Sequence, residues 1–369
     1  MLSIKNNRVL LVVGTRPNFI KVTRFKEANA SLGNPFDIRI VHTGQHHNDE
    51  MAGVFFRQFG LEPDYFLEVP PSSPNTQMAE TMIRLEKKIL ETDPGIVLVT
   101  GDVNSTFAAA FTAYKCGYPV GHIESGLRSF DRSMPEEINR VLTDEITDLF
   151  FVTEQSGIDN LLKEGKDAGQ IHFVGNTMID TLVRFDAEIR KDPVLETLGI
   201  DSKSYALMTM HRPATVDLEK GLERLAELLE ALTACIAVVF PVHPRTLKNI
   251  QGFGLQERFD RIPRLHRTPP LDYFAFQRLL FDSALVISDS GGLQEESTFR
   301  QIPCLTLRPN TERPSTITIG SNELVEADQG LVMDKVDAIL GGRFKQGQIP
   351  PHWDGKSTER ILEVLKSLL

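Results

Sequence analysis

A chain of 369 residues exceeds the usual size of one hydrophobic core, so two domains are expected, and 41% hydrophobic residues suffice for a core in each. Fifty acidic against forty basic residues give a net charge of −10 without a Lys/Arg block, which argues against nucleic-acid or membrane-surface binding. The short apolar run 9–13 excludes an N-terminal signal or membrane span. Three scattered cysteines without a CxxC pair predict a reduced, cytoplasmic protein with its cysteines in the core.

Short β-rich runs alternate with segments of helical periodicity along the chain. The first series of expected strands comprises 9–13, 38–41, 96–99, 119–123, 149–152 and 171–174. After a charged, weakly patterned stretch, a second series comprises 206–210, 236–240, 284–288 and 304–307. Strands that are apolar throughout are buried on both faces, which is typical of parallel sheets between helices. The fold class is therefore α/β, with two doubly wound Rossmann-like domains, 1–174 and 175–356, facing a cleft.

The residues that directly follow these strands are unusually polar. Ligands bind outside the carboxyl ends of the strands in doubly wound sheets, so these positions are the informative ones. They are Gly14 to Pro17, His42 to His46, Gly101-Asp102, Glu124, His211-Arg212, His243 and Asp289 to Gly292. Seven polar strand ends predict one shared ligand site.

The stretch SDSGGLQEES, residues 288–297, joins a strand to a helix beginning near Leu293. Backbone N–H groups of Ser290, Gly291 and Gly292 at a helix start can receive a phosphate, and Glu296 can accept hydrogen bonds from ribose hydroxyls. The alternative is an ordinary helix start that Asp289 or Ser290 caps.

The stretch GTRPNFIK, residues 14–21, repeats this arrangement at the first strand. Arg16 and Lys21 are two cations at a helix start, which favours a bound anion there, although both could simply be solvated. The turn has no GxGxxG pattern, so no nicotinamide or flavin cofactor is expected. The histidines of HTGQHH lack the spacing of metal ligands, so no metal is expected either.

The block GHIESGLRSFDRSMPEEINR, residues 121–140, collects four carboxylates and three arginines directly after a strand. With GTRPNFIKV, HTGQHHNDEM, VLVTGDVNSTFAAAF, MHRP, PVHP, ISDSGGLQEES and TERP, it makes almost the whole chain resemble the non-hydrolysing UDP-N-acetylglucosamine 2-epimerases. The resemblance implies a glycosyltransferase-B-like fold whose C-terminal helix, 357–369, returns to the first domain, and a homodimer. It also implies a cofactor-free isomerase that interconverts UDP-GlcNAc and UDP-ManNAc for cell-surface polysaccharide synthesis.

The same resemblance implies two sets of site residues. The implied catalytic residues are Asp102, Glu124, Glu136 and His211. The implied contacts to UDP-sugar and UDP are Arg16, Lys21, Gln45, His46, Phe276, Ser290, Gly291, Gly292, Glu296 and Arg313. In this assignment Phe276 lies near uracil, Ser290 to Gly292 hold the diphosphate, and Glu296 binds ribose.

Inversion at C2 with loss of UDP from C1 passes through a glycal, and it requires one carboxylate as base and another as acid. Which carboxylate has which role stays open. We expect Arg128 and Arg132 to neutralise the carboxylate cluster.

Several substrates and one other class of function remain open. Asn18 stands where the family commonly has Glu or Gln, and Ser315 stands where it commonly has Glu. The blocks LRSFDRSMPEEINRVLTDEITD and GDVNST are more similar to those of relatives acting on UDP-2,3-diacetamido sugar acids. The alternative substrate is such a sugar acid or a related UDP-HexNAc. A glycosyltransferase of the same architecture or a non-catalytic nucleotide-sugar sensor are the alternatives of another class. Epimer formed without an acceptor would exclude both.

Overall fold

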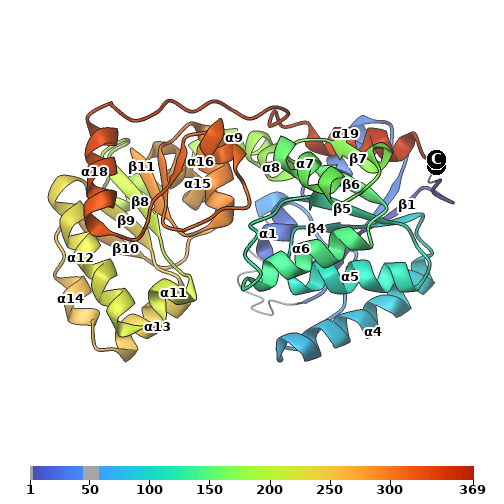
Figure 1. The fold of residues 1–369 in the computed structure, drawn as a ribbon, viewed down its shortest axis with the longest axis horizontal. Coiled ribbons are helices and arrows are strands. Elements are labelled where there is room, and N and C mark those ends of the chain that lie inside the picture. Colours follow the sequence, from blue (N-terminus) through green and yellow to red (C-terminus); the bar gives the residue numbers. More distant parts are fainter. Residues whose placement is uncertain (1–2, 45–57) are drawn as a thin grey trace. The chain divides into compact units, whose positions relative to one another are not determined.

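The computed structural model describes residues 3–44 and 58–369, apart from the side chains of Arg16 and Ala214. It divides into two compact units: unit 1 comprises Met1–Arg184 and Pro351–Leu369, and unit 2 comprises Phe185–Pro350 (Figure 1). Each unit is built on its own parallel sheet, and the α/β class with two doubly wound Rossmann-like parts is confirmed. In the described ranges, no helix is both long and apolar enough to cross a lipid bilayer.

Unit 1 contains a seven-stranded sheet in the order β3-β2-β1-β4-β5-β6-β7. Its strands are β1 Arg8–Val13, β2 Asp37–His42, β3 Tyr65–Phe66, β4 Ile96–Thr100, β5 Val120–Ser125, β6 Leu149–Val152 and β7 Ile171–Phe173. All neighbouring strands pair in parallel. Side chains alternate between the two faces, as Leu10 and Val12 of β1 show by packing with Val97 and Val99 of β4 in one core.

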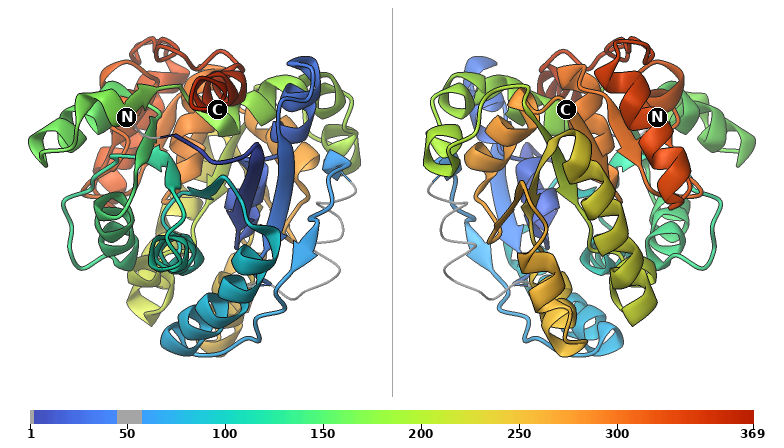
Figure 2. Two further views of the ribbon diagram at one scale, coloured as in Figure 1. Left: turned by 90° about the vertical axis from the view of Figure 1, so that its right-hand side faces the viewer. Right: turned by 90° about the vertical axis from the view of Figure 1, so that its left-hand side faces the viewer.

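Helices cover both faces of this sheet, as Figure 1 and the left view of Figure 2 show. They are α1 Arg16–Ile20, α2 Phe25–Ser31, α4 Pro74–Thr92, α5 Asn104–Lys115, α6 Pro135–Glu145, α7 Gln155–Lys163, α8 Thr177–Arg184 and α19 Ser357–Lys366, with a 3₁₀ turn at Ala168–Gln170. Helices α4, α5 and α6 pack side by side, and α19 packs on α2 and α8. The sheet is therefore buried on both sides, as its apolar strands require.

The C-terminal segment belongs to unit 1 because buried polar contacts attach it to α8. Asp180 accepts hydrogen bonds from the backbone N–H groups of Ser357 (3.0 Å) and Thr358 (2.6 Å), and so caps the start of α19. Trp353 is buried and donates from its indole nitrogen to the carbonyl of Thr153 (2.9 Å). The junctions expected from sequence, after 174 and before 357, both lie within unit 1.

Unit 2 contains a six-stranded parallel sheet in the order β10-β9-β8-β11-β12-β13. Its strands are β8 Tyr205–Thr209, β9 Ala237–Pro241, β10 Leu265–Thr268, β11 Leu285–Ser288, β12 Cys304–Thr306 and β13 Asn322–Leu324. Its helices are α9 Asp186–Arg190, α10 Val194–Leu198, α11 Pro213–Val216, α12 Glu219–Cys235, α13 Pro244–Gly252, α14 Gln256–Asp260, α15 Tyr273–Asp282, α16 Gly291–Arg300, α17 Ser315–Thr318 and α18 Gln329–Leu340.

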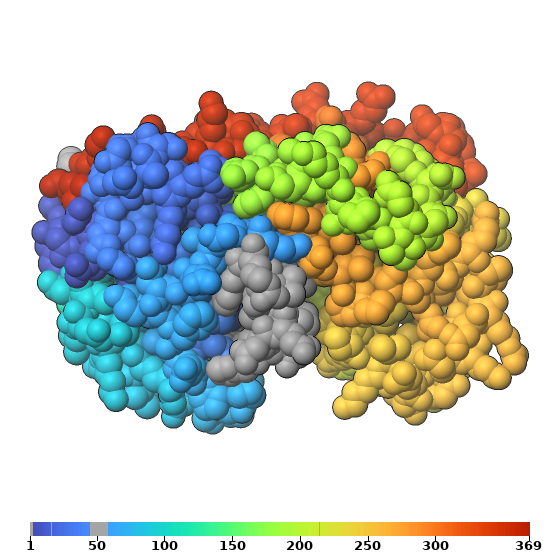
Figure 3. All heavy atoms as spheres, turned by 180° about the vertical axis from the view of Figure 1, so that it is seen from behind, coloured from blue at the N-terminus to red at the C-terminus, as the bar shows by residue number. Residues whose placement is uncertain are grey.

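Two cores lie on opposite faces of the second sheet. Met208 on β8 packs with α12 and α18, which lie together in the right view of Figure 2, whereas Leu207 packs with α10, α15 and α16. Figure 3 shows the segment of α9 and α10 on the surface of unit 2. The prediction of three core cysteines is wrong for Cys235, which is exposed at the end of α12, where only the opposite helix face is buried.

Candidate active site

The two sheets share a topological switch point. In unit 1 the strand order reverses between β1 and β4, and in unit 2 it reverses between β8 and β11. Loops that leave such a pair of strands diverge to opposite faces and open a crevice at the carboxyl edge. The polar residues predicted from sequence follow these strands, so each unit concentrates its candidate site residues at this edge.

In unit 1, Lys21 and Glu124 form a buried ion pair beside the turn after β4. Lys21 is 8% exposed and Glu124 is 6% exposed. A Cβ on Gly101 would lie 3.3 Å from the Lys21 ammonium and 3.5 Å from the Glu124 carboxylate. Asn18 donates to the Thr100 carbonyl (2.9 Å), which joins α1 to the end of β4. The carboxylate of Glu124 is therefore buried against the ammonium group of Lys21.

Glu124 has an unusual backbone conformation for a residue with a side chain. Its φ is +73°, and the pairing of β5 with β6 shifts register between Ile123 and Ser125 at this point. Left-handed conformations disfavour non-glycine residues, and a bulge turns a strand residue out of the regular alternation. Two residues later, Gly126 packs so closely on Gly157 that a Cβ on Gly126 would lie 2.4 Å from the Gly157 carbonyl oxygen. The end of β5 is therefore built to orient Glu124.

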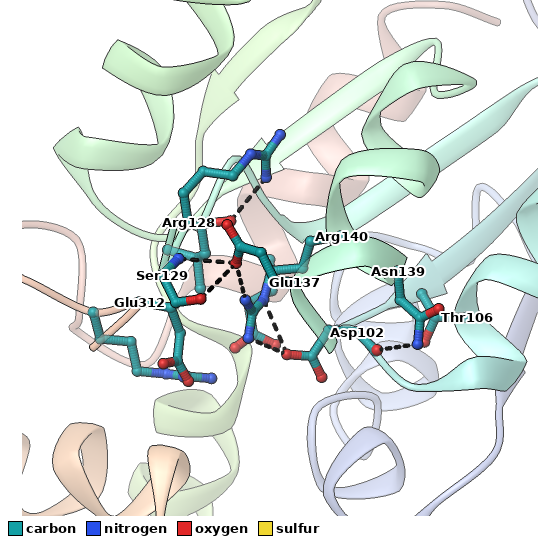
Figure 4. A network of polar contacts seen from close by, with 12 residues as sticks. Asp102, Thr106, Arg128, Ser129, Glu137, Asn139, Arg140 and Glu312 are labelled. Atoms are coloured by element: carbon teal, nitrogen blue, oxygen red, sulfur yellow. Dashed lines mark hydrogen bonds and ion pairs between the residues drawn. The ribbon is translucent and has the colours of Figure 1, made fainter. Parts of the chain in front are cut away.

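Asp102, directly after β4, is held by helix α6. Arg140 donates from Nε (3.0 Å) and Nη2 (2.6 Å) to Oδ2 of Asp102, as Figure 4 shows. Asn139 donates to the Asp102 carbonyl oxygen (2.9 Å). Asp102 is about one quarter exposed. The carboxylate is thus oriented by a buried guanidinium and still reaches solvent.

The two neighbouring glutamates of α6 have different environments. Glu136, the predicted catalytic residue, is exposed in the first turn of the helix. Glu137 is buried and accepts hydrogen bonds from the backbone N–H groups of Ser129 and Phe130 (2.9 Å each) and from Arg140 (2.6 Å). Figure 4 shows Glu137 between Ser129 and Arg140. Glu137 therefore secures the loop before α6, and Glu136 stays accessible on the face shared by Arg140.

A second buried network, centred on His122, joins β5 to the turn after β4 and to helix α6. His122 is fully buried, with Nε2 2.8 Å from the Gly101 carbonyl oxygen and Nδ1 2.7 Å from Oδ1 of Asp144. Arg128 lies 2.7 Å from the other oxygen of Asp144 and also binds Glu164. Burial by itself would raise the pKa of Asp144, but its contacts with His122 and Arg128 lower it below its ordinary value.

This arrangement corrects the expectation that Arg128 neutralises the catalytic carboxylates. Arg128 faces Asp144 and Glu164, because it lies beyond the bulge of β5 on the side of α7. Arg132 is exposed. The cations that pair with the predicted catalytic carboxylates are Lys21 for Glu124 and Arg140 for Asp102.

In unit 2, His211 and Asp289 bridge the switch point. Asp289 follows β11 and is buried, and its Oδ1 lies 2.8 Å from Nδ1 of His211, which follows β8. Its Oδ2 accepts the backbone N–H groups of His211 (2.9 Å) and Arg212 (2.8 Å). Burial would raise the pKa of Asp289, but His211 and these hydrogen bonds lower it overall. The His211 side chain is 42% exposed.

Helix α16 begins beside this pair with Ser290, Gly291 and Gly292. Ser290 occupies the N-cap position, but its side chain makes no capping hydrogen bond, and its N–H donates to Oγ of Ser288 (2.9 Å). A Cβ on Gly291 would lie 2.8 Å from Oε1 of Glu312 and 2.9 Å from Nη1 of Arg313. The first helical N–H groups, those of the two glycines, are therefore the donors that suit an anion.

The remaining predicted residues of unit 2 lie on or near α16. Glu296 is buried one turn after the glycines, and Phe276 on α15 is partly buried against the core that contains Leu293. Arg313 is buried, with Nε 2.9 Å from Glu295, and it also pairs with Glu312. Gln45 and His46 lie outside the described residues, as does the side chain of Arg16. Among the described residues, no group of three His, Cys, Asp or Glu side chains could hold a metal ion.

The fold and these edges define the class: a two-unit, doubly wound α/β protein with paired carboxylates at one switch point and a helix start suited to phosphate at the other. The profile of the family UDP-N-acetylglucosamine 2-epimerase matches residues 30–366. The chain therefore belongs to the UDP-N-acetylglucosamine 2-epimerase family, and it is an isomerase by class.

Individual relatives cover nearly the whole chain. It is 36% identical over 368 residues to the UDP-N-acetylglucosamine 2-epimerase of Methanocaldococcus jannaschii, covering 97% of this chain and 98% of the relative. It is 37% identical over 367 residues to the UDP-2,3-diacetamido-2,3-dideoxy-D-glucuronate 2-epimerase of Pseudomonas aeruginosa, covering 98% and 100%. A crystal structure of the M. jannaschii enzyme in complex with UDP-GlcNAc and UDP has a TM-score of 0.89 at 35% identity, covering 98% and 99%.

Sequence reasoning missed the roles of three residues that organise these edges. Glu137 and Arg140 belong to the charged block 121–140, but charge alone did not show which members face inward. Asp289 is among the post-strand residues expected at the ligand site, with a helix cap as the alternative, but its bonds across the sheet to the turn after β8 were not expected. Its position directly after a strand at the switch point was the available signal.

Proposed function

We propose that this protein catalyses the reversible C2 epimerisation of UDP-N-acetylglucosamine to UDP-N-acetylmannosamine, which serves cell-surface polysaccharide synthesis. The observation that carries the proposal is the environment of Glu124. Its carboxylate is buried beside Lys21 and the Gly101-Asp102 turn, and its own backbone is left-handed at the bulge of β5. A backbone conformation that costs free energy at a carboxylate is typical of a functional site. A sensor has no use for such a group, and simple glycosyl transfer has no evident use for the Asp102, Glu124 and Glu136 cluster.

In the proposed reaction one carboxylate removes the C2 proton while the bond between C1 and the diphosphate oxygen breaks. UDP leaves with the electron pair, and a C1–C2 double bond forms, giving the glycal. A second carboxylic acid returns a proton to C2 on the opposite face as UDP adds again to C1. Asp102, Glu124 and Glu136 are the proposed acid–base groups. Lys21 and Arg140 stabilise the charges of Glu124 and Asp102 during the cycle.

Unit 2 is proposed to hold UDP. The N–H groups of Gly291 and Gly292 at the start of α16, a ten-residue helix, suit the diphosphate, with Arg16, Lys21, His211 and Arg313 as further contacts. Glu296, one turn later, is the proposed acceptor for ribose hydroxyls, and Phe276 is the proposed neighbour of uracil. Gln45 and His46 remain proposed substrate contacts.

The second candidate substrate is a UDP-2,3-diacetamido sugar acid. The observation that favours it is the 37% identity to the P. aeruginosa relative, against 36% to the M. jannaschii relative. Incubation with each UDP-sugar separately, without acceptor, followed by proton NMR of the anomeric region distinguishes them. The proposal expects an equilibrium of two C2 epimers from UDP-GlcNAc. Epimer from the diacetamido sugar alone would replace the substrate, and no epimer from either would contradict the proposed activity.

We further propose that the protein is a homodimer in the cytoplasm. Support for the dimer comes from α5, where Phe107 and Phe111 stack with ring centroids 5.8 Å apart and Tyr114 is 55% exposed. Aromatic side chains gathered on one exposed helix face are typical of protein interfaces. Light scattering of the wild type should give twice the chain mass, and Tyr114→Glu should shift it toward the monomer. A monomeric wild type would contradict the proposal. The free cysteines are in keeping with a reducing compartment.

A further inference from the structure

Asp289 and His211 form a carboxylate–imidazole pair that the proposed reaction does not itself explain. Asp289 has no exposed surface, whereas the His211 side chain is 42% exposed. The two residues come from different strands, β11 and β8, and meet where the strand order reverses. A buried carboxylate facing a half-exposed histidine is a common way to orient a ring that acts on a ligand.

The contacts of Asp289 decide which nitrogen of His211 carries a proton. Its pKa is lowered overall, so it is a carboxylate that can only accept hydrogen bonds at neutral pH. Oδ2 is used by the backbone N–H groups of His211 and Arg212, and Oδ1 faces Nδ1 of the ring at 2.8 Å. An unprotonated Nδ1 would place its lone pair against this oxygen. The 2.8 Å separation therefore favours a hydrogen on Nδ1, and Nε2 on the opposite side of the ring faces away from Asp289.

We propose that Asp289 is a positioning residue for His211: it fixes the orientation of the imidazole through Nδ1–H and stabilises the ring when both nitrogens carry a proton, so that Nε2–H is presented to the diphosphate of the nucleotide sugar. This inference rests on the proposed function. The substrate class is that of the proposed function. The added inference is that Asp289, which does not contact the ligand, controls which ring nitrogen of His211 donates to it.

The same carboxylate couples His211 to the turn that begins α16. Asp289 directly precedes Ser290 and the two glycines, and Arg212 donates from Nε to the Asp289 carbonyl oxygen (3.0 Å). Asp289 therefore links the ring, the Arg212 backbone and the turn that leads to the two glycines. His243 stacks near His211 with ring centroids 5.7 Å apart, and burial, His211 and Arg245 lower the pKa of His243. His243 is thus the uncharged neighbour of the pair.

This geometry has a chemical consequence. A carboxylate at Nδ1–H stabilises the positive charge that the ring acquires when Nε2 also carries a proton. Nε2–H can then donate to a diphosphate oxygen whose negative charge grows as the bond to C1 breaks. Without Asp289 the positive ring loses its carboxylate partner, so less of the population carries both protons and can donate from Nε2–H to the anion.

A double-mutant cycle with Asp289→Asn and His211→Asn tests the inference. The asparagine carbonyl oxygen can still accept the two backbone N–H groups, while its NH₂ faces Nδ1 and forces the proton to Nε2. We expect D289N to lower kcat by about 100-fold or more, with KM changed by less than roughly threefold. In the H211N background the same substitution should change kcat by less than about twofold. Equal losses in both backgrounds would mean that Asp289 acts on the fold and not through His211.

A spectroscopic measurement keeps the inference testable if D289N does not fold or if no sugar is turned over. In ¹⁵N-histidine spectra of the wild type, H211N identifies the His211 signals among the nine histidines. A protonated Nδ1 in the free protein and a shift of Nε2 on adding UDP support the proposal. An unprotonated Nδ1, or a UDP response confined to Nδ1, would overturn it. Lack of epimer from every UDP-sugar would instead contradict the proposed reaction, and the spectra alone would then judge the role of Asp289.

Discussion

At the carboxyl edge of the first sheet, residues at the ends of β5 and β4 form two ion pairs: Glu124 with Lys21, both buried, and Asp102 with Arg140, in which Asp102 is one quarter exposed. At the equivalent edge of the second sheet, the residues after β8 and β11 form a half-exposed histidine, a buried carboxylate and a glycine helix start. Both sheets reverse strand order at this point. The same topology thus supports paired acid–base groups in unit 1 and an anion site in unit 2.

This difference shows that topology fixes where a site lies and a few post-strand residues fix its chemistry. Unit 1 relies on left-handed backbone at Gly101 and Glu124 to bring side chains together. Unit 2 relies on the absence of side chains at Gly291 and Gly292, which leaves helix N–H groups accessible. Substitutions at the two edges should therefore separate turnover from nucleotide binding.

The largest effect is expected from Glu124→Gln. The amide keeps an oxygen that can accept from Lys21 but cannot take a proton, so turnover should fall by about 100-fold or more. UDP affinity, measured by calorimetry, should stay within roughly twofold because the amide oxygen still accepts from Lys21 and the helix start of α16 is unchanged. Glu145→Gln is the matched control, since Glu145 is 72% exposed on the same unit, and it should keep normal turnover. Near-normal turnover in E124Q would remove Glu124 from the mechanism.

The adjacent glutamates of α6 provide the next test. Glu136→Gln should lower turnover by about 100-fold with little change in stability, because Glu136 is exposed and is the proposed acid–base group. Glu137→Gln should cost about 2–4 kcal/mol of unfolding free energy, because it weakens buried bonds to Arg140 and to the loop at Ser129. Urea unfolding and turnover assays on both variants are required. If E137Q loses turnover without losing stability, the roles of the two residues are exchanged.

Alanine substitution of one glycine at the carboxyl edge of each sheet compares the two units directly. Gly101→Ala combines a φ of +70° with a Cβ 3.1 Å from Asn18 and 3.3 Å from Lys21. It should mainly lower kcat, by about tenfold, since about 1–2 kcal/mol of strain falls on the Lys21–Glu124 pair. Gly291→Ala would bring a Cβ within 2.8 Å of Glu312 and should mainly weaken UDP binding, also by about tenfold. The comparison fails if both variants change the same parameter.

The smallest effect concerns pH and Asp289. Its pKa is lower in the folded protein than in the unfolded chain, so its contribution to stability is fully present above the unfolded value of about 3.9. That contribution is lost as the pH falls through the lower folded value. The difference in unfolding free energy between wild type and Asp289→Asn should therefore shrink as the pH falls below about 4. A difference that does not shrink below this pH would contradict the assigned charge state of Asp289.

Long apolar strands were predictable because burial on both faces leaves a direct pattern in the sequence. The short edge strands β3, β10 and β13 were missed, since they pair on one side only and two contain polar residues such as Arg267 and Asn322. Asp102 and Glu124 were placed correctly at strand ends. The left-handed backbone of Glu124 was not predictable, because it depends on the bulge against β6.

The sequence also could not predict which of two adjacent residues faces inward or which distant residues pair. Whether Glu136 or Glu137 faces inward depends on the rotation of α6 against the loop at Ser129, which is a tertiary contact. The link from Asp289 to His211 joins residues 78 positions apart, and no local pattern records it. Local periodicity locates elements and their ends, but pairings between elements require the fold.

Epimerisation by elimination and re-addition exchanges the C2 hydrogen with solvent, so the decisive experiment is run in heavy water. The wild type is incubated with UDP-GlcNAc in D₂O with a chelator and no added nicotinamide, and the sugar is followed by NMR. Both carboxylates exchange protons with solvent, so the epimer should carry deuterium at C2, and the C2 proton signal should disappear at the rate of epimer formation. Epimer that retains its original C2 proton would contradict the account.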